Sequence, residues 1–112
     1  MERVKILLRE AKEEIGVDED VNLRIIPMKY KIASLSLEKK VLRLNKNVVE
    51  KLDDEEIKYI LLHELVHLKI KDVSHGSLFF GEIEKYFQHG RIREIEISII
   101  NKLLSRIAIQ NL

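Results

Sequence analysis

The chain has 112 residues and no cysteine, so it is long enough for one domain with its own core, and any metal ion must be held by histidine, carboxylate or carbonyl groups. Its 20 basic residues are scattered among 19 acidic ones, which gives a net charge of +1. This balance provides no basic surface for a nucleic acid, and we expect no such partner.

The first predicted element is an amphipathic helix near the N-terminus. Apolar residues recur at helical spacing from Val4 to Ile15, and Gly16 stands where a helix C-cap belongs. Charged residues interrupt this segment throughout, which argues against a signal peptide or a membrane span, and the uncharged runs elsewhere are far shorter than the roughly 20 residues that a span needs. We therefore expect a cytoplasmic protein without a membrane span.

A small antiparallel sheet is predicted next. Residues 21–28 are rich in strand-forming residues and contain the single proline. Residues 32–37 and 41–44 then alternate between apolar and polar side chains on either side of a charged turn at 38–40. We interpret the two alternating runs as an antiparallel hairpin, although its turn lacks the glycine or asparagine that is usual there.

The clearest helix signals lie in residues 53–70. Asp53 is placed as the N-cap, and Glu56 follows at the position of the capping-box partner. Two further carboxylates in the first turn suit the positive end of the helix dipole. These signals predict a helix that carries the sequence HELVH in its second half.

A polar connection over residues 71–76 follows this helix, and Ser77 is positioned to cap another helix over 78–88. A last helix is predicted over 91–112. The expected fold is thus α+β, a single domain over residues 1–112 in which a small antiparallel sheet packs on the HELVH helix.

His63 and His67 are four residues apart, so on a helix their side chains are about 40° apart around the axis and one turn apart along it. Both imidazoles can therefore reach one metal ion without distorting the backbone. Glu64 is turned by about 100° from His63, where it can hold a metal-bound water instead of competing for the same position. Helix geometry alone separates two candidate ligands from one candidate base.

The surroundings of these residues favour a metal site over histidines that are simply satisfied within a core. The helix is apolar on nearly every side. Two histidines and a glutamate in such a helix are costly unless their polar atoms are satisfied, and a metal ion with its water would satisfy all three. A metal site is the interpretation that we adopt.

A catalytic zinc ion normally has three protein ligands and one open position, so a third ligand is required. His75 is the first choice, because the polar connection after the helix is long enough to turn the chain back. Glu82 and Glu84 are competitors, since some peptidases use a glutamate on the next helix. His89 is less favoured because it stands at a helix end.

Residues 42–80 resemble the minigluzincins, a family of small zinc peptidases. The resemblance rests on a strand with an asparagine, a capped helix with the motif HELVH, and the downstream segment HGSLFF. It implies His63, His67 and His75 as zinc ligands and Glu64 as the base, in a soluble minimal version of the catalytic domain of some membrane metallopeptidases. It also implies a latent form that is blocked by the C-terminal segment.

We therefore predict a zinc-dependent metallopeptidase that acts on peptides or proteins. Neutral imidazoles leave a zinc ion its full charge, so the pKa of its water can fall to about 7, and Glu64 takes the proton as the water attacks a carbonyl. Two alternatives stay open. One is a zinc hydrolase of a non-peptide substrate such as a nucleotide, and the other is a non-catalytic metal protein that acts through interaction.

An extended peptide would bind along an exposed edge of the hairpin. The sequence does not say which strand is that edge, and both strands could equally well pack on the active-site helix.

The C-terminal helix over residues 91–112 is apolar over roughly twice the arc of an ordinary surface helix. Ile109 lies outside even this arc, and the residues that form the arc are Ile92, Ile95, Ile97, Ile99, Ile100, Leu103, Leu104 and Ile107. One neighbouring surface does not cover this arc, so we expect the helix to cover either the active-site cleft or a second copy, as a regulatory or exchanged segment in a homo-oligomer. The alternative is a central core helix that is buried on several sides.

Overall fold

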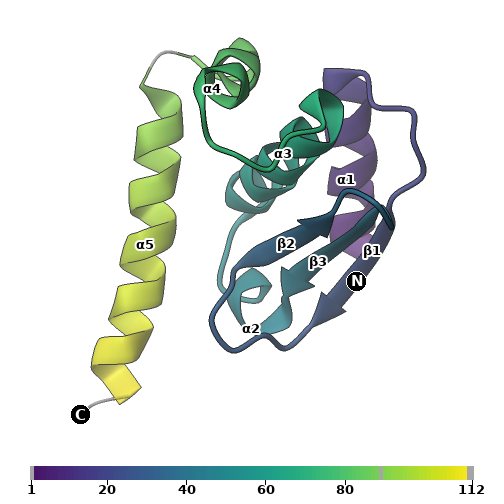
Figure 1. Ribbon diagram of the computed structural model, residues 1–112. Helices are drawn as coiled ribbons and strands as arrows, with labels where there is room; N and C mark the ends of the chain where they lie inside the picture. Colours follow the sequence, from purple (N-terminus) through teal and green to yellow (C-terminus); the bar gives the residue numbers. More distant parts are fainter. Residues whose placement is uncertain (1, 89, 111–112) are drawn as a thin grey trace.

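The computed structural model describes residues 2–88 and 90–110, and side chains as far as Leu104 (Figure 1). The predicted α+β class is confirmed. None of the described helices is long and apolar enough to cross a membrane. The elements are α1 Glu2–Ile15, β1 Asn22–Ile26, β2 Ala33–Ser36, β3 Val41–Asn45, α2 Lys46–Val49, α3 Asp54–Ile70, α4 Ser77–Ile83, the 3₁₀ helix η1 Glu84–Tyr86, and α5 Arg91–Gln110.

α1 packs on α3 through one apolar stripe. The helix ends at Gly16, whose φ of 71° is the left-handed conformation that glycine adopts without strain, as predicted for the C-cap. The N–H of Val17 then donates to the carbonyl of Lys12 at 3.0 Å and closes the last turn. The buried residues of the stripe are Val4, Leu7, Leu8, Ala11 and Ile15.

The sheet has three strands in the order β1-β3-β2. β2 and β3 are antiparallel, with Ala33 opposite Leu44 and Ser36 opposite Val41, which confirms the predicted hairpin. Lys40 supplies the left-handed turn residue, with φ of 53°, in place of glycine or asparagine. β1 pairs with β3 in the parallel direction, so the sheet is mixed, whereas antiparallel pairing was expected throughout.

The parallel pair arises because the loop over residues 27–32 crosses the end of β3, so that β1 and β2 lie on either side of it. Asn45 at the end of β3 fixes the conformation of this loop through hydrogen bonds. Its amide group donates to the carbonyls of Met28 at 2.9 Å and Lys31 at 2.8 Å, and its backbone N–H donates to the carbonyl of Ile32 at 2.9 Å. The contacts that set the strand order are therefore non-local.

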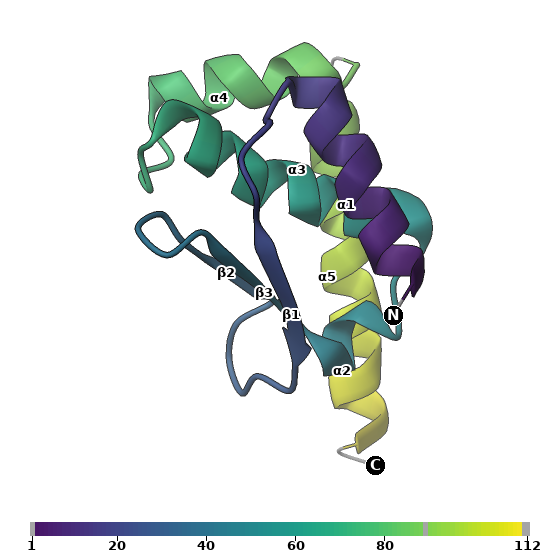
Figure 2. The same ribbon diagram turned by 90° about the vertical axis from the view of Figure 1, so that its right-hand side faces the viewer.

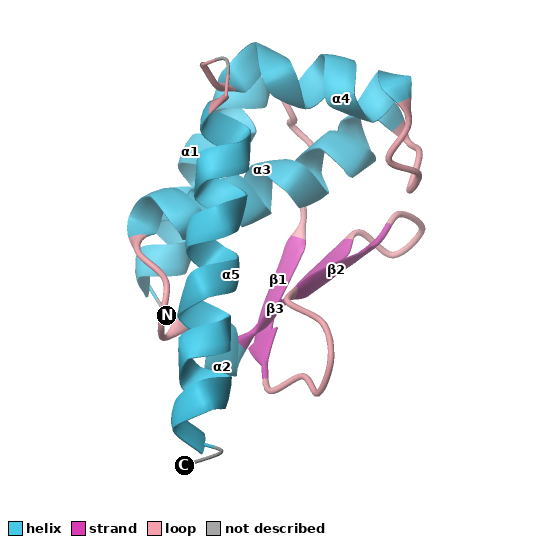
Figure 3. Ribbon diagram, turned by 90° about the vertical axis from the view of Figure 1, so that its left-hand side faces the viewer, coloured by secondary structure: helices cyan, strands magenta, loops and turns pink. Residues whose placement is uncertain are grey.

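α3 is the centre of the core and is buried on nearly every side. α1 and α5 lie on opposite sides of it, as the two opposite views show (Figures 2 and 3). α5 buries Ile95 and Ile99, whereas Ile107 and Ile109 lie outside the described side chains. α5 is an outer helix, and it leaves three large apolar residues about half exposed: Ile97, Ile100 and Leu104.

Candidate metal centre

α3 is fixed at both ends. The side chain of Asp53 accepts from the N–H of Glu56, and the Glu56 carboxylate accepts from the N–H of Asp53, both at 2.9 Å, so the predicted capping box is present. At the other end Lys71 adopts a left-handed conformation with φ of 54° and donates its N–H to the carbonyl of His67. This residue ends the helix and turns the chain.

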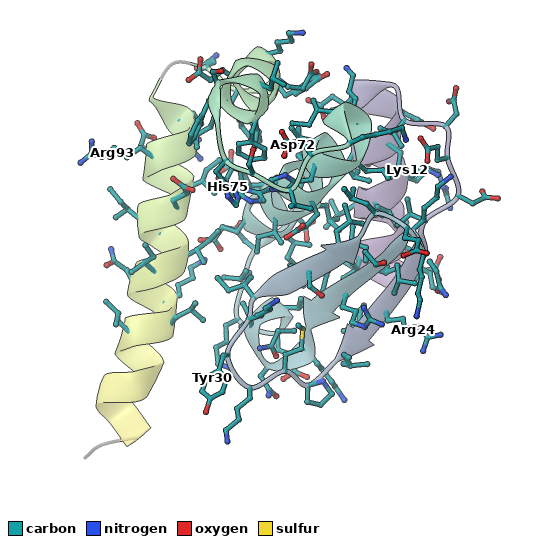
Figure 4. The ribbon with its side chains drawn as sticks, in the orientation of Figure 1. Lys12, Arg24, Tyr30, Asp72, His75 and Arg93 are labelled. Atoms are coloured by element: carbon teal, nitrogen blue, oxygen red, sulfur yellow. The ribbon has the colours of Figure 1, made fainter. Side chains whose placement is uncertain are left out.

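The turn brings His75 back toward α3, as Figure 4 shows. Nε2 of His75 lies 3.1 Å from Nε2 of His63 and 3.2 Å from Nε2 of His67. Nitrogens that bind one zinc ion tetrahedrally at about 2.0–2.1 Å are about 3.3 Å apart, so these distances suit a shared ion. Among the described residues, this is the group of three whose ligand atoms lie within 4.8 Å of one another.

The backbone carbonyl of Asp72 orients the ring of His67. It lies 2.8 Å from Nδ1 of His67, so a proton on Nδ1 donates to it and the lone pair of Nε2 is left for the cluster. The carboxylate of Asp72 accepts from the N–H of Ser74 at 2.8 Å, which fixes the turn. Asp72 was not predicted as a site residue, although an aspartate two residues before a serine in a polar connection is a typical turn signal.

Phe79 packs against all three histidine rings. Its ring stacks on His67 with centroids 4.5 Å apart, and the centroids of His63 and His75 lie at 4.7 Å and 5.0 Å. Phe79 is only 2% exposed. It therefore restricts the positions of the rings and keeps water from one side of the cluster. The sequence marked it only as part of the segment HGSLFF.

The two histidines of α3 are held in their neutral form. Burial, and then the neighbouring His67 and His75, lower the pKa of His63 to about 4. Burial also lowers the pKa of His67, although the hydrogen bond to the Asp72 carbonyl opposes this shift. A metal ligand must be a neutral imidazole, so near pH 7 no proton has to leave these rings before a metal binds.

Glu64 faces the same cleft as the histidines, a cavity of about 850 Å³. Burial raises the pKa of Glu64 to about 7, against the opposing charge of Lys31. A carboxyl group with such a pKa can both take up and release a proton at neutral pH. The cleft lies between α3, α5, β2 and the loop before β2, and its lining includes Tyr30, Lys31, Ser34, Tyr59, Glu96 and Ile100.

The competing ligands lie outside this cluster. Glu82 accepts hydrogen bonds from Lys69 at 2.8 Å and from Tyr86 at 2.6 Å, and these contacts lower the pKa of Glu82 to about 2. Within the described part of the chain, neither Glu82 nor Glu84 belongs to the histidine group. His89 lies outside the described residues.

Residues 2–82 match the family model of the BlaR1 peptidase M56. Among similar proteins, MJ0123 of Methanocaldococcus jannaschii, whose function is uncharacterised, is 46% identical over 90% of this chain and 92% of its own length. The similarly uncharacterised aq_aa15 of Aquifex aeolicus is 37% identical over 90% of this chain and 87% of its own length.

Two solved structures share the fold. The metallopeptidase zymogen of Methanocaldococcus jannaschii jannalysin matches with a TM-score of 0.85 and 47% identity over 89% of both chains. The metallopeptidase zymogen of Pyrococcus abyssi abylysin matches with a TM-score of 0.83 and 42% identity over 90% of this chain and 95% of its own. These similarities confirm the predicted minigluzincin-like family.

Proposed function

The chain belongs to the BlaR1 peptidase M56 family, and from this premise we propose a zinc-dependent metallopeptidase in which His63, His67 and His75 hold the ion and Glu64 is the general base. The fold shared with two metallopeptidase zymogens supports peptide hydrolysis. The observation that carries the proposal is the convergence of three Nε2 atoms in one cleft with a carboxyl group. Three imidazole ligands suit zinc. The cytoplasm is the proposed location.

A bound zinc ion would polarise the substrate carbonyl and lower the pKa of the attacking water to about 7. Glu64 carries out the proton transfers, because its carboxylate oxygen accepts a proton from the water and passes it to the nitrogen of the leaving amine. The carbonyl of Asp72 holds the His67 ring so that Nε2 faces the cluster.

β2 is the proposed binding edge for an extended peptide. The strand order leaves β2 at an edge of the sheet, and Ala33, Ser34 and Leu35 of this strand line the cleft. β1 is the other edge, and none of its described residues lines the cleft. Backbone groups along β2 can pair with a substrate backbone without demanding a particular sequence.

A nucleotide substrate is not favoured by the cleft. Among the described residues that line it, Lys31 is the one lysine or arginine, and no glycine takes part. A polyphosphate group calls for several cations or a glycine-rich nest of N–H groups.

α5 is proposed to hold the full-length chain latent or to pair it with a second copy. The two solved structures described above are zymogens. α5 contributes Glu96, Ile99 and Ile100 to the wall of the cleft. Ile97 and Leu104 are 48% and 56% exposed, so the described part of the chain leaves apolar surface on α5 uncovered.

The peptidase proposal is tested by the variant Glu64→Gln in a zinc-loaded chain with a peptide library. We expect the variant to keep its zinc in elemental analysis and to lose turnover by about 10²–10⁴-fold. Glu84→Gln makes the same change at an exposed position outside the described histidine group, and it should keep both zinc and activity. Comparable activity of Glu64→Gln and the unchanged chain would contradict the assignment.

Latency is tested by measuring mass in solution and peptidase activity with and without the residues after Arg91. We expect the shortened chain to be monomeric and more active. The same result is expected for the full-length chain with Ile97→Glu and Leu104→Glu combined. This second test does not depend on folding of the shortened chain, because the variant leaves the buried Ile95 and Ile99 in place. A full-length chain that is both monomeric and active would contradict latency.

A further inference from the structure

The loop over residues 27–32 contributes a cation to the wall of the cleft. Lys31 of this loop lines the cleft together with His63 and Glu64, and it is the one lysine or arginine among the described lining residues. The loop lies between β1 and β2, so this part of the wall does not depend on α5. The proposed hydrolysis has no use for Lys31, because the candidate ligands and the base come from α3 and from the connection that follows it.

The backbone of Lys31 is fixed by Asn45. The side-chain amide of Asn45 donates to the carbonyl of Lys31 at 2.8 Å, and its backbone N–H donates to the carbonyl of Ile32 at 2.9 Å. Asn45 is only 5% exposed, and its side-chain oxygen accepts from the N–H of Asn47 at 3.0 Å. Lys31 is therefore an exposed side chain on an anchored backbone, and only that side chain has to be ordered when it binds a ligand.

The charge of Lys31 has no partner within the described part of the chain. Of the ion pairs that the described residues form, none includes Lys31. Two carboxyl groups line the same cleft, those of Glu64 and Glu96. Lys31 is close enough for its charge to act on Glu64 without an ion pair, and Glu96 accepts from the hydroxyl of Tyr59 at 2.8 Å. The ammonium group of Lys31 is thus available to a substrate.

Lys31 stands just before the strand that is the proposed binding edge. β2 begins two residues later, and its residues 33–35 line the cleft. An extended peptide that pairs with β2 advances by about 3.3 Å per residue, so it passes Lys31 a few positions away from the residue at the metal centre. A lysine ammonium group donates strong hydrogen bonds to a carboxylate. Position and charge together match a peptide with an anionic group at such a distance.

We propose that Lys31 selects peptides that carry a carboxylate a few residues from the scissile bond, bound by the ammonium group beside the start of β2. The carboxylate belongs either to an aspartate or glutamate side chain or to the C-terminus of the peptide. The inference rests on the proposed peptidase function and adds the class of substrate. Because the site needs no residue of α5, the preference is expected in any active form of the chain that keeps the sheet.

The test compares blocked peptides, acetylated and amidated at their ends, that differ only by glutamate or glutamine at one position, which is moved stepwise across the scissile bond. The enzymes are the zinc-loaded full-length chain and its variant with Ile97→Glu and Leu104→Glu, whose substitutions on α5 lie outside the described lining. We expect kcat/KM to be about tenfold higher for glutamate at one position. Lys31→Gln should abolish this preference, whereas Lys31→Arg should retain it because the charge is kept.

Lys29→Gln is the matched control. Lys29 carries the same charge on the same loop, but its ammonium group lies over the ring of Tyr30, 5.3 Å from the centroid, and Lys29 is not part of the described lining. The variant should keep the preference for glutamate. Peptides with a free carboxyl end form a further arm. A preference that appears only in that arm and depends on Lys31 identifies the α-carboxylate as the anion and supports the inference.

Hydrolysis without any preference for an anion, or a preference that survives Lys31→Gln, overturns the inference and leaves the peptidase proposal intact. An equal fall of kcat/KM for both peptides in Lys31→Gln also overturns it, because Lys31 would then act on the reacting carbonyl and not on a carboxylate of the substrate.

If neither enzyme hydrolyses a peptide, the peptidase proposal fails for these forms of the chain, and binding decides the inference separately. Fluorescence anisotropy of the same peptides is then measured on both zinc-loaded forms, with and without Lys31→Gln. Tighter binding of the glutamate peptide supports the inference if it requires Lys31, and any other result overturns it.

Discussion

α3 and α5 are the two longest helices, with 17 and 20 residues, but the protein uses them differently. α3 is capped at both ends and buried on nearly every side. α5 buries Ile95 and Ile99 and leaves other isoleucines exposed. The candidate metal ligands need fixed positions, and two of them, His63 and His67, lie on the buried helix α3. α5 contributes Glu96, Ile99 and Ile100 to the wall of the cleft.

A buried carboxylate joins the two helices. Glu56 is 2% exposed, and besides its role in the cap of α3 it accepts hydrogen bonds from Ser98 at 2.6 Å and from Lys102 of α5. Although burial opposes the shift, the contacts with Lys102 and Ser98 lower the pKa of Glu56. The start of the active-site helix and the middle of α5 therefore share one anionic group.

The largest effect is expected for a substitution in α3, the helix that is fixed at both ends. His67→Ala removes a buried candidate ligand and the ring that stacks on Phe79. Zinc affinity should fall by more than the roughly 10–100-fold that is typical for loss of an outer partner of a ligand, and peptidase activity should be lost with it. Elemental analysis after dialysis measures the zinc content. An unchanged content would show that His67 is not a ligand.

The link between the helices is tested by Glu56→Ala. Lys102 and Ser98 would lose a buried partner, so the free energy of unfolding should fall by about 3 kcal/mol. Glu55→Gln is the control, because Glu55 is exposed and pairs only on the surface with Arg91, and it should cost less than about 1 kcal/mol. Urea denaturation measures both. Equal losses of unfolding free energy in the two variants would mean that only apolar contacts hold α5 against α3.

Glu82→Gln probes the end of α3 where Lys69 and Tyr86 bind this carboxylate. We expect a loss of about 1 kcal/mol of unfolding free energy at pH 7. The pKa of Glu82 is lowered from 4.5 to about 2 in the folded state, so its contribution is complete above about pH 4.5 and is lost as the pH falls toward 2. The difference between the variant and the unchanged chain should shrink across that window. A constant difference would contradict the role of the ionised carboxylate.

The smallest effect is expected at the turn after α3. Lys71→Gly relieves the left-handed conformation, which costs other residues about 1–2 kcal/mol, but glycine loses more entropy on folding, so the net gain is about 0.5–1 kcal/mol. Lys71→Ala removes the surface pair with Glu19 in the same way but leaves the strain. Thermal unfolding should rank glycine above alanine, and equal stabilities would show that no strain is stored there.

The features that could be predicted are those that depend on residues close together in the sequence. Asp53 and Glu56 are three residues apart, and His63 and His67 four, so helix geometry alone places each pair. The fold class and the hairpin follow from periodicity in the same way. His75 was chosen from the length of the connection, and the structure brings it to the two helical histidines.

The features that could not be predicted depend on contacts far apart in the chain. The parallel pairing of β1 depends on Asn45, which binds carbonyls 14 and 17 residues away. Tyr59 and Glu96 are 37 residues apart. Neither residue stands out, because one belongs to an apolar helix and the other is one of several charges on α5. The left-handed turn at Lys71 also lacks the glycine that would have marked it.

X-ray absorption at the zinc edge, on the zinc-loaded chain and on His75→Ala, tests the proposed centre most directly. The unchanged chain should show three imidazole ligands and one oxygen from solvent at about 2.0–2.1 Å. His75→Ala should show one imidazole fewer, while His63 and His67 stay bound. Two imidazoles in the unchanged chain, or the same number in both forms, would contradict the three-histidine centre.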